Sequence, residues 1–191
     1  MRRRQKIAIT AAVAAIACCA ATRAEAAAYY PPPALTWSHG QMNGGARYGS
    51  DNLNLGFGAR GGYTLPNGIY FGGLFDYFIG ESQSETLGGT TISASAHLWD
   101  IGAEGGFDFA LMDKLMIRPF LGIGVAVATG DICMDQIGGP MCVHASNNDS
   151  FIEFGGLLNY LSGSLMFGGD ARVLAASGTS VVIGGHIGWL F

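Results

Sequence analysis

The sequence contains no run of about 18 apolar residues, the length expected of a membrane-spanning helix. The nearest approach to such a run lies at the extreme N-terminus. Even so, 49% of the 191 residues are hydrophobic, which is unlike an ordinary soluble protein. A chain of this length has room for one domain. If the chain enters a membrane, it must do so without an apolar helix.

The N-terminal segment predicts a secretory signal peptide. A basic head spans residues 2–6, a mostly apolar segment spans residues 7–21, and a small-x-small site lies at residues 24–26. We expect cleavage after this site, so that residues 1–26 are removed and the protein is exported. An uncleaved anchor and a lipoprotein signal are the alternatives, but no leucine stands three residues before either N-terminal cysteine.

Basic residues are scarce in the expected mature chain. Removal of the signal leaves five basic and thirteen acidic residues, a net charge of −8. Nucleic acids bind through neutralisation of their phosphates, so this balance excludes them as partners. Runs that resemble a GxGxxG phosphate loop lie inside strand-like segments and open no helix. We therefore expect no cofactor.

Cysteines are equally few. Two of the four leave with the signal, and Cys133 and Cys142 remain. In an exported protein an even pair predicts a disulfide. Asp131, Asp135 and His144 accompany the pair and leave a metal site as the alternative, but a loop closed by a disulfide explains the same residues more simply.

The sequence is instead rich in glycine and in apolar residues with a period of two. Glycine accounts for 31 residues, about twice its usual share, without the spacing of collagen. Between residues 99 and 109 the odd positions are apolar or glycine, whereas Asp100, Glu104 and Asp108 stand at even positions. A helix would contain three glycines, each of which costs about 1 kcal/mol, and would set the like charges on one face. The alternation therefore predicts a strand with one apolar face.

Six further segments alternate in the same way, and short turns near residues 67, 113 and 162–163 separate some of them. Longer polar loops are expected over residues 81–91 and 130–149. These lengths predict an all-β, antiparallel up-and-down transmembrane β-barrel over residues 51–191. Such a barrel needs an even number of strands, so we place an eighth over Ala34–Gly40, within the N-terminal segment 27–50, followed by a glycine-rich loop. The six further strands span residues 53–63, 69–79, 115–127, 152–160, 167–173 and 181–191.

Charge pairing indicates which face is inside, since a soluble barrel hides its apolar face and a membrane barrel exposes it. A two-residue turn at Ser162–Gly163 sets Glu153 directly opposite Arg172. Similar counting at the other two short turns sets Asp108 opposite Arg118 and Arg60 diagonal to Asp76.

An arginine on the lipid face would cost about 2 to 4 kcal/mol, so the arginines should point inward. The alternative is a soluble sandwich with a charged, water-facing side. We expect a lumen filled by ion pairs, without an open pore. The predicted luminal network comprises Arg60, Asp76, Asp100, Glu104, Asp108, Arg118, Glu153, Asp170, Arg172 and His186.

The chain ends in an aromatic residue preceded by apolar residues at alternate positions, namely Ile183, Ile187, Trp189 and Phe191. This pattern resembles the C-terminal assembly signal of bacterial outer-membrane proteins. From about residue 53 onward the chain resembles the small eight-stranded outer-membrane barrels of the outer-membrane protein A, protein X and opacity type, although a proline triplet stands where their first strand should be. The resemblance implies a Gram-negative outer membrane, contact with its lipid, and insertion by the barrel assembly machinery.

Three functions remain open. The first is a monomeric, non-enzymatic barrel that reinforces the envelope and displays its long loops to an extracellular partner for adhesion or recognition. The second is a narrow, porin-like channel for ions or small solutes. The third is a lipid-modifying enzyme, for which Ser93, Ser95 and His97 near the outer rim are the candidates; rim polarity explains them more simply, and we expect no catalytic residue.

Overall fold

The computed structural model describes residues 38–51, 53–87, 90–136 and 139–191. These residues form nine β-strands, and they include no helix of the length and hydropathy that a membrane span requires. The signal and the proline triplet lie outside the described residues. The strands are β1 (His39–Gly49), β2 (Asn54–Thr64), β3 (Ile69–Leu87), β4 (Thr90–Phe107), β5 (Phe109–Met112), β6 (Leu115–Gln136), β7 (Gly139–Ser162), β8 (Leu165–Ala175) and β9 (Thr179–Leu190).

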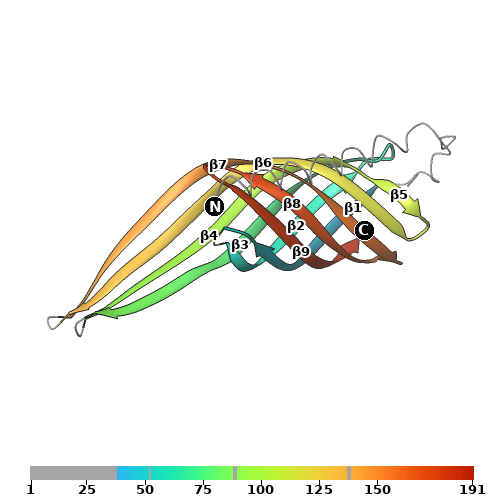
Figure 1. The fold of residues 1–191 in the computed structure, drawn as a ribbon. Coiled ribbons are helices and arrows are strands. Elements are labelled where there is room, and N and C mark those ends of the chain that lie inside the picture. The colour runs from blue at the N-terminus through green and yellow to red at the C-terminus, as the bar shows by residue number, and fades with distance from the viewer. Residues whose placement is uncertain (1–37, 52, 88–89, 137–138) are drawn as a thin grey trace, which may run out of the picture. The chain divides into compact units, whose positions relative to one another are not determined.

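The strands close into a barrel (Figure 1). Each strand is antiparallel to its neighbours, β1 pairs with β9, and the β4–β6 pairing closes the ring. β5 continues β4 after Asp108 and pairs with the same partner, β6, so the two together act as one strand of the wall. The prediction of an eight-stranded up-and-down antiparallel barrel is therefore confirmed.

The first described strand extends further along the chain than predicted, and residues 34–37 of the predicted strand lie outside the described residues. The expected strand was Ala34–Gly40, and the expected glycine-rich loop after it is wrong, because β1 occupies His39–Gly49. Its glycines belong to the wall of the barrel. A Cβ at Gly45 would collide with the carbonyl oxygen of Gly185 on β9, so glycine permits the two strands to approach closely here.

The barrel carries its apolar residues on the outside. Leu121 and Ile123 on β6 are each 64% exposed, whereas the arginines at positions 47, 60, 118 and 172 are at most 2% exposed. An exposed apolar surface of this extent is unfavourable in water and favourable in lipid. The fold therefore has the inside-out arrangement of a transmembrane barrel.

Four strands continue beyond the others. β3, β4, β6 and β7 have 18 to 24 residues, whereas the remaining full-length strands have 11 or 12. They leave the barrel side by side and form a curved four-stranded sheet in the order β3-β4-β6-β7 (Figure 1). The loops predicted over residues 81–91 and 130–149 are therefore wrong. Neither segment has an apolar outward face, yet neighbouring strands satisfy the backbone hydrogen bonds. We call this part the outer sheet: residues 82–87, 90–96, 130–136 and 139–146.

Candidate functional site

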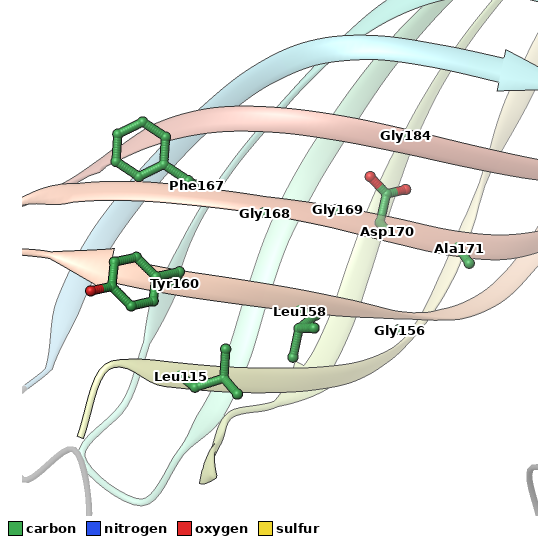
Figure 2. A pocket seen from close by; sticks show the side chains of 10 residues that line it. All are labelled: Leu115, Gly156, Leu158, Tyr160, Phe167, Gly168, Gly169, Asp170, Ala171 and Gly184. Carbon is green, nitrogen blue, oxygen red and sulfur yellow. The ribbon is translucent and has the colours of Figure 1, made fainter. Parts of the chain in front are cut away.

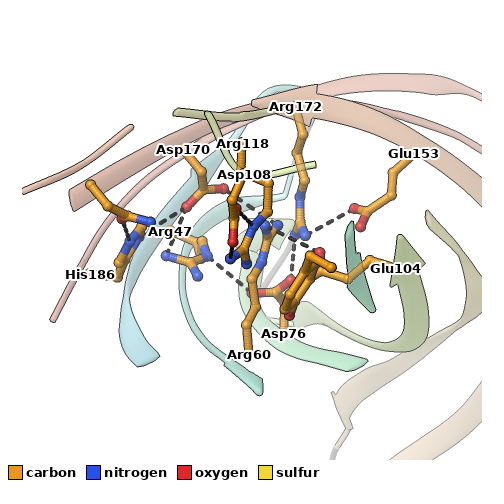
Figure 3. Close-up of polar contacts among 12 residues, drawn as sticks. Arg47, Arg60, Asp76, Glu104, Asp108, Arg118, Glu153, Asp170, Arg172 and His186 are labelled. Carbon is orange, nitrogen blue, oxygen red and sulfur yellow. Dashed lines mark hydrogen bonds and ion pairs between the residues drawn. The ribbon is translucent and has the colours of Figure 1, made fainter. Parts of the chain in front are cut away.

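The middle of the lumen holds a connected set of buried charges (Figure 3). Asp76 on β3 lies at its centre. One carboxylate oxygen of Asp76 accepts from Arg47 Nε at 3.2 Å, and the other accepts from Arg172 Nη2. Arg172 also pairs with Glu153 on β7, with Nη1 and Oε2 3.0 Å apart. Residues from β1, β3, β7 and β8 thus meet in one cluster.

A second carboxylate, Asp170, extends the cluster across the barrel. Its oxygens lie 3.3 Å from Arg47 Nη1, 3.6 Å from Arg60 Nη2 and 3.6 Å from His186 Nδ1. Arg60 also reaches Glu104 on β4, with Nη1 and Oε2 3.4 Å apart. Arg47, Arg60 and Arg172 are therefore each shared by two carboxylates, which ties opposite walls of the barrel together.

The end of the network nearest the short turns contains the pair Arg118–Asp108. Arg118 Nε and Nη2 donate to the two Asp108 oxygens at 2.5 and 2.7 Å, a bidentate geometry. Thr64 Oγ1 donates to Asp108 at 2.7 Å. The Arg118 guanidinium stacks 3.5 Å from the centroid of Tyr70, whose hydroxyl donates to Glu104 at 2.9 Å. Tyr70 therefore connects this pair, through Glu104, to Arg60 and the rest of the network.

Acids outnumber arginines in the described part of the lumen. Six carboxylates and four arginines are buried there. Asp100 lies directly opposite Asp76 on the neighbouring strand, is fully buried, and makes no hydrogen bond through its carboxylate oxygens. The predicted residue is in the lumen, but no ion pair within 4 Å joins it to the described arginines.

The predicted register between β7 and β8 is wrong by two residues. Glu153 was expected opposite Arg172, but Arg172 faces Gly155. The two-residue turn is Gly163–Ser164, because glycine occupies its first position with a φ of 64°, which suits a hairpin turn that begins with a left-handed residue. Glu153 and Arg172 are diagonal neighbours, and their long side chains still meet.

The other two short turns have the predicted alignment. Asp108 and Arg118 pair across the β5–β6 turn. Arg60 is diagonal to Asp76, but its ion pairs go to other carboxylates. Sequence reasoning missed Arg47, because the segment that contains it was interpreted as a loop; the alternation of inward polar residues along 39–47 was the available signal.

Apolar clusters lie on both sides of the charged layer. Two clusters pack in the lumen toward the outer sheet, and one packs beside the short turns at the opposite end. The charged side chains between these clusters are at most 7% exposed. The outer clusters comprise Leu74, Ala126, Phe151 and Leu174, and Leu53, Phe78 and Val182; the inner one comprises Met116, Met166 and Leu190.

The C-terminal residues face outward and close the barrel. The backbone N–H of Phe191 donates to the Gly40 carbonyl at 2.9 Å, and the Gly40 N–H donates back at 2.7 Å. This exchange fastens the last strand to the first. The four residues of the predicted assembly signal, Ile183, Ile187, Trp189 and Phe191, are 53 to 76% exposed.

The outer sheet contains the predicted disulfide. Cys133 and Cys142 are register partners on β6 and β7 and are bonded to each other, which confirms the prediction. Next to them, His144 Nδ1 lies 2.7 Å from an Asp131 oxygen. The described residues include no group of three His, Cys, Asp or Glu side chains that could hold a metal ion.

The three candidate residues of a rim enzyme lie on the outward side of β4. His97 stacks on Tyr77 of β3, with ring centroids 6.0 Å apart and an interplanar angle of 17°. Ser95 and Ser93 lie farther along the outer sheet, opposite Ser82 and Ser84. Sheet packing thus accounts for the position of the imidazole.

An apolar groove lies on the outside of the barrel between β7 and β8 (Figure 2). Its volume is about 520 Å³. Gly156, Gly169 and Ala171 form its floor, and Tyr160 and Phe167 form part of its rim. Asp170 also borders the groove, but its carboxylate is buried in the lumen against Arg47 and Arg60, so the groove presents no charged group.

A closed ring of antiparallel strands with an apolar exterior and a charged interior defines the class of the small transmembrane β-barrels. No family model matches the chain, and no curated protein matches it.

Solved structures do match. The chain is similar to a major outer membrane protein from Thermus thermophilus, with a TM-score of 0.58, 13% identity, and coverage of 81% of this chain and 100% of that one. It is also similar to Ail, the attachment invasion locus protein of Yersinia pestis, in complex with the heparin analogue sucrose octasulfate. That match has a TM-score of 0.57, 13% identity, and coverage of 81% and 99%. At this identity the likeness shows the fold, and the predicted resemblance to small eight-stranded outer-membrane barrels is confirmed.

Proposed function

We propose that the protein is a monomeric, non-enzymatic barrel of the bacterial outer membrane, closed to solutes, that supports the envelope and presents its outer sheet for adhesion or recognition. The observation that carries this proposal is the layered lumen. A solute would have to pass one apolar cluster, a layer of paired charges and a second apolar cluster.

The charged layer resists opening because its members are mutually dependent. Removal of one partner from a buried ion pair costs about 3 to 5 kcal/mol, since the other charge stays buried without compensation. Asp76 and Asp170 each contact two arginines. Arg47, Arg60 and Arg172 are also each shared by two carboxylates, so displacement of one arginine removes an ion-pair partner from two carboxylates at once.

Conductance in planar bilayers tests the closed lumen. Protein whose insertion is verified by heat-modifiable gel migration should give no current steps, while a porin in the same bilayer serves as the positive control. Discrete, reproducible conductance would replace this proposal with the narrow-channel alternative.

Export and orientation support the same role. We infer that residues 1–26 are cleaved, that the barrel assembly machinery inserts the chain through its C-terminal strand, and that outer-membrane lipid surrounds the apolar exterior. The short turns then face the periplasm and the outer sheet faces outside, as the loop lengths of this class require. N-terminal sequencing of the mature protein should begin at Ala27.

Surface display can be measured in intact cells with a membrane-impermeant maleimide. Ser146→Cys in the outer sheet should be labelled, whereas Asn67→Cys in the β2–β3 turn is the matched control and should be labelled only after lysis. The reverse pattern would show that the outer sheet is not presented to the exterior.

Lipid composition tests the non-enzymatic part of the proposal. Cells that carry His97→Ala should have the same lipids as cells with the wild-type protein. A lost or altered lipid species would favour the lipid-modifying alternative.

A further inference from the structure

The barrel wall is apolar on the outside and polar on the inside, whereas the outer sheet has the opposite arrangement. Register fixes which residues share each face, because inward positions of the wall continue along the same strands. The face that continues the outside of the barrel is polar and includes Ser93, Thr129, Asp131, His144 and Ser146. On β4, β6 and β7 the face that continues the lumen is apolar and includes Ile92, Ala94, Ile132, Met134, Met141 and Val143, while β3 adds Gln83 and Glu85 at its edge.

This reversal places the outer sheet above the lipid. A polar outward face is unfavourable in the hydrocarbon of a bilayer, so the lipid-facing belt ends where the polar residues begin. The apolar inner face then meets water. Ile132, Met141 and Val143 on it are 53 to 59% exposed. A contiguous apolar patch in water marks a binding surface.

The inner face contains a hollow of about 310 Å³, near the lower end of the volume of ligand sites. Its floor is formed by small residues, including Ala94, Ala96, Gly130 and Ala145. Asp131 also borders it, but the Asp131 carboxylate is on the opposite face, paired with His144. Gln83 of β3 borders the hollow on one side. The hollow therefore offers an apolar floor beside one amide, with no charged side chain directed into it.

Two features hold this face in shape. The Cys133–Cys142 disulfide lies on the polar side, between the register pairs Ile132–Val143 and Met134–Met141 that point to the apolar side. Where the outer sheet joins the barrel, Leu98 packs against the luminal cluster of Leu53, Phe78 and Val182. The apolar surface thus continues from the mouth of the lumen onto a braced sheet.

We propose that the inner face of the outer sheet binds the single acyl or alkyl chain of an amphiphile taken from the aqueous phase outside the bilayer. The small-residue floor accepts a narrow chain, and the lack of charge in the hollow leaves the polar head in water. The bilayer is not the source of this amphiphile, because the polar outward face of the outer sheet places the hollow in water, outside the hydrocarbon of the membrane.

A photoreactive palmitic acid with a diazirine in its chain tests the proposal with wild-type protein in phospholipid nanodiscs. The probe is added in water, and cross-linked positions are mapped by mass spectrometry. We expect saturable labelling of the inner face of the outer sheet that unlabelled palmitic acid suppresses. Ala145→Asp should weaken apparent binding about tenfold or more, equivalent to about 1.4 kcal/mol. The neighbouring Ser146→Asp, on the polar face, should bind like wild type.

Several results would overturn the proposal. These are labelling confined to the lipid-facing belt, a lack of competition by palmitic acid in wild type, and equal binding by the two aspartate variants. Labelling of the outer sheet only by a diazirine phospholipid placed in the nanodisc would assign the face to bilayer lipid. Cross-linked dimers through Ile132 and Val143 without probe would assign it to a second copy. Competition in the wild type does not depend on the variants, so misfolding of a variant would not obscure the result.

Discussion

Arg172→Met is the most informative single change in the lumen. It keeps a long side chain but removes the charge that joins Asp76 to Glu153. Breaking a buried pair costs about 3 to 5 kcal/mol, mostly because the remaining charge is buried without a partner. The two carboxylates are not equally affected. Asp76 keeps Arg47 at 3.2 Å, whereas Arg172 is the only ion-pair partner of Glu153 among the described residues.

This asymmetry predicts which second change restores stability. Glu153→Gln in the Arg172→Met background removes the stranded charge and should recover about 2 kcal/mol or more of the loss. Asp76→Asn in the same background should recover less, because it also removes the partner of Arg47. Charge reversal by Arg172→Glu with Glu153→Arg should recover stability only in part, since the new carboxylate on β8 would then face Asp76.

Equilibrium unfolding in urea, with the protein in lipid vesicles and tryptophan fluorescence as the signal, measures these free energies. A double-mutant cycle with wild type, both single variants and the double variant isolates the coupling. A loss below about 0.5 kcal/mol for Arg172→Met, within the range of ordinary surface changes, would refute the buried ion-pair network. Equal rescue by Glu153→Gln and Asp76→Asn would refute the assignment of partners.

Three further outcomes follow from the geometry. Leu121→Lys on the exterior should lower stability in vesicles by about 2 to 4 kcal/mol, while Ser146→Lys should change it little; equal losses would contradict the position of the lipid boundary. Reduction of the disulfide should speed proteolysis of β6–β7 in the outer sheet and leave the barrel folded, as shown by gel migration. Hydrogen bonds from the Ser177 side chain and then its backbone N–H hold the pKa of Asp149 below its usual range, so this contact should persist at neutral pH and be lost only as acid titrates the lowered pKa. Amide hydrogen exchange at Ser177, compared with Asp149→Asn, measures it.

The barrel and its orientation could be predicted because a period of two and the cost of charge in lipid are local properties of each strand. The Asp108–Arg118 pair could be predicted because the turn between them is short and its centre is marked by residues 113–114. Register at the β7–β8 turn could not, since Ser162, Gly163 and Ser164 permit two placements that differ only in which residue takes the positive φ.

The parts that sequence reasoning missed share a physical cause. The outward face of β1 has only Met42 and Tyr48 as large apolar residues, separated by glycine and alanine, and the outward face of the outer sheet is polar, so the alternation in both carried little contrast. Their strand structure depends on pairing with distant segments, such as β1 with β9. Because residues 41–49 were not predicted as a strand, Arg47 was missed, although it is one of the two arginines that pair with Asp76.

Contacts between lipid chains and methyl groups test the inside-out arrangement most directly. Leu158 and Ile183 are 47% and 53% exposed, whereas their chain neighbours Leu157 and Val182 are 1% and 0% exposed. In nanodiscs, nuclear Overhauser effects from lipid acyl protons should reach the methyls of Leu158 and Ile183 and not those of Leu157 and Val182. Lipid contacts at Leu157 and Val182 instead, or contacts at none of the four, would contradict a barrel with its apolar face in lipid and its charges enclosed.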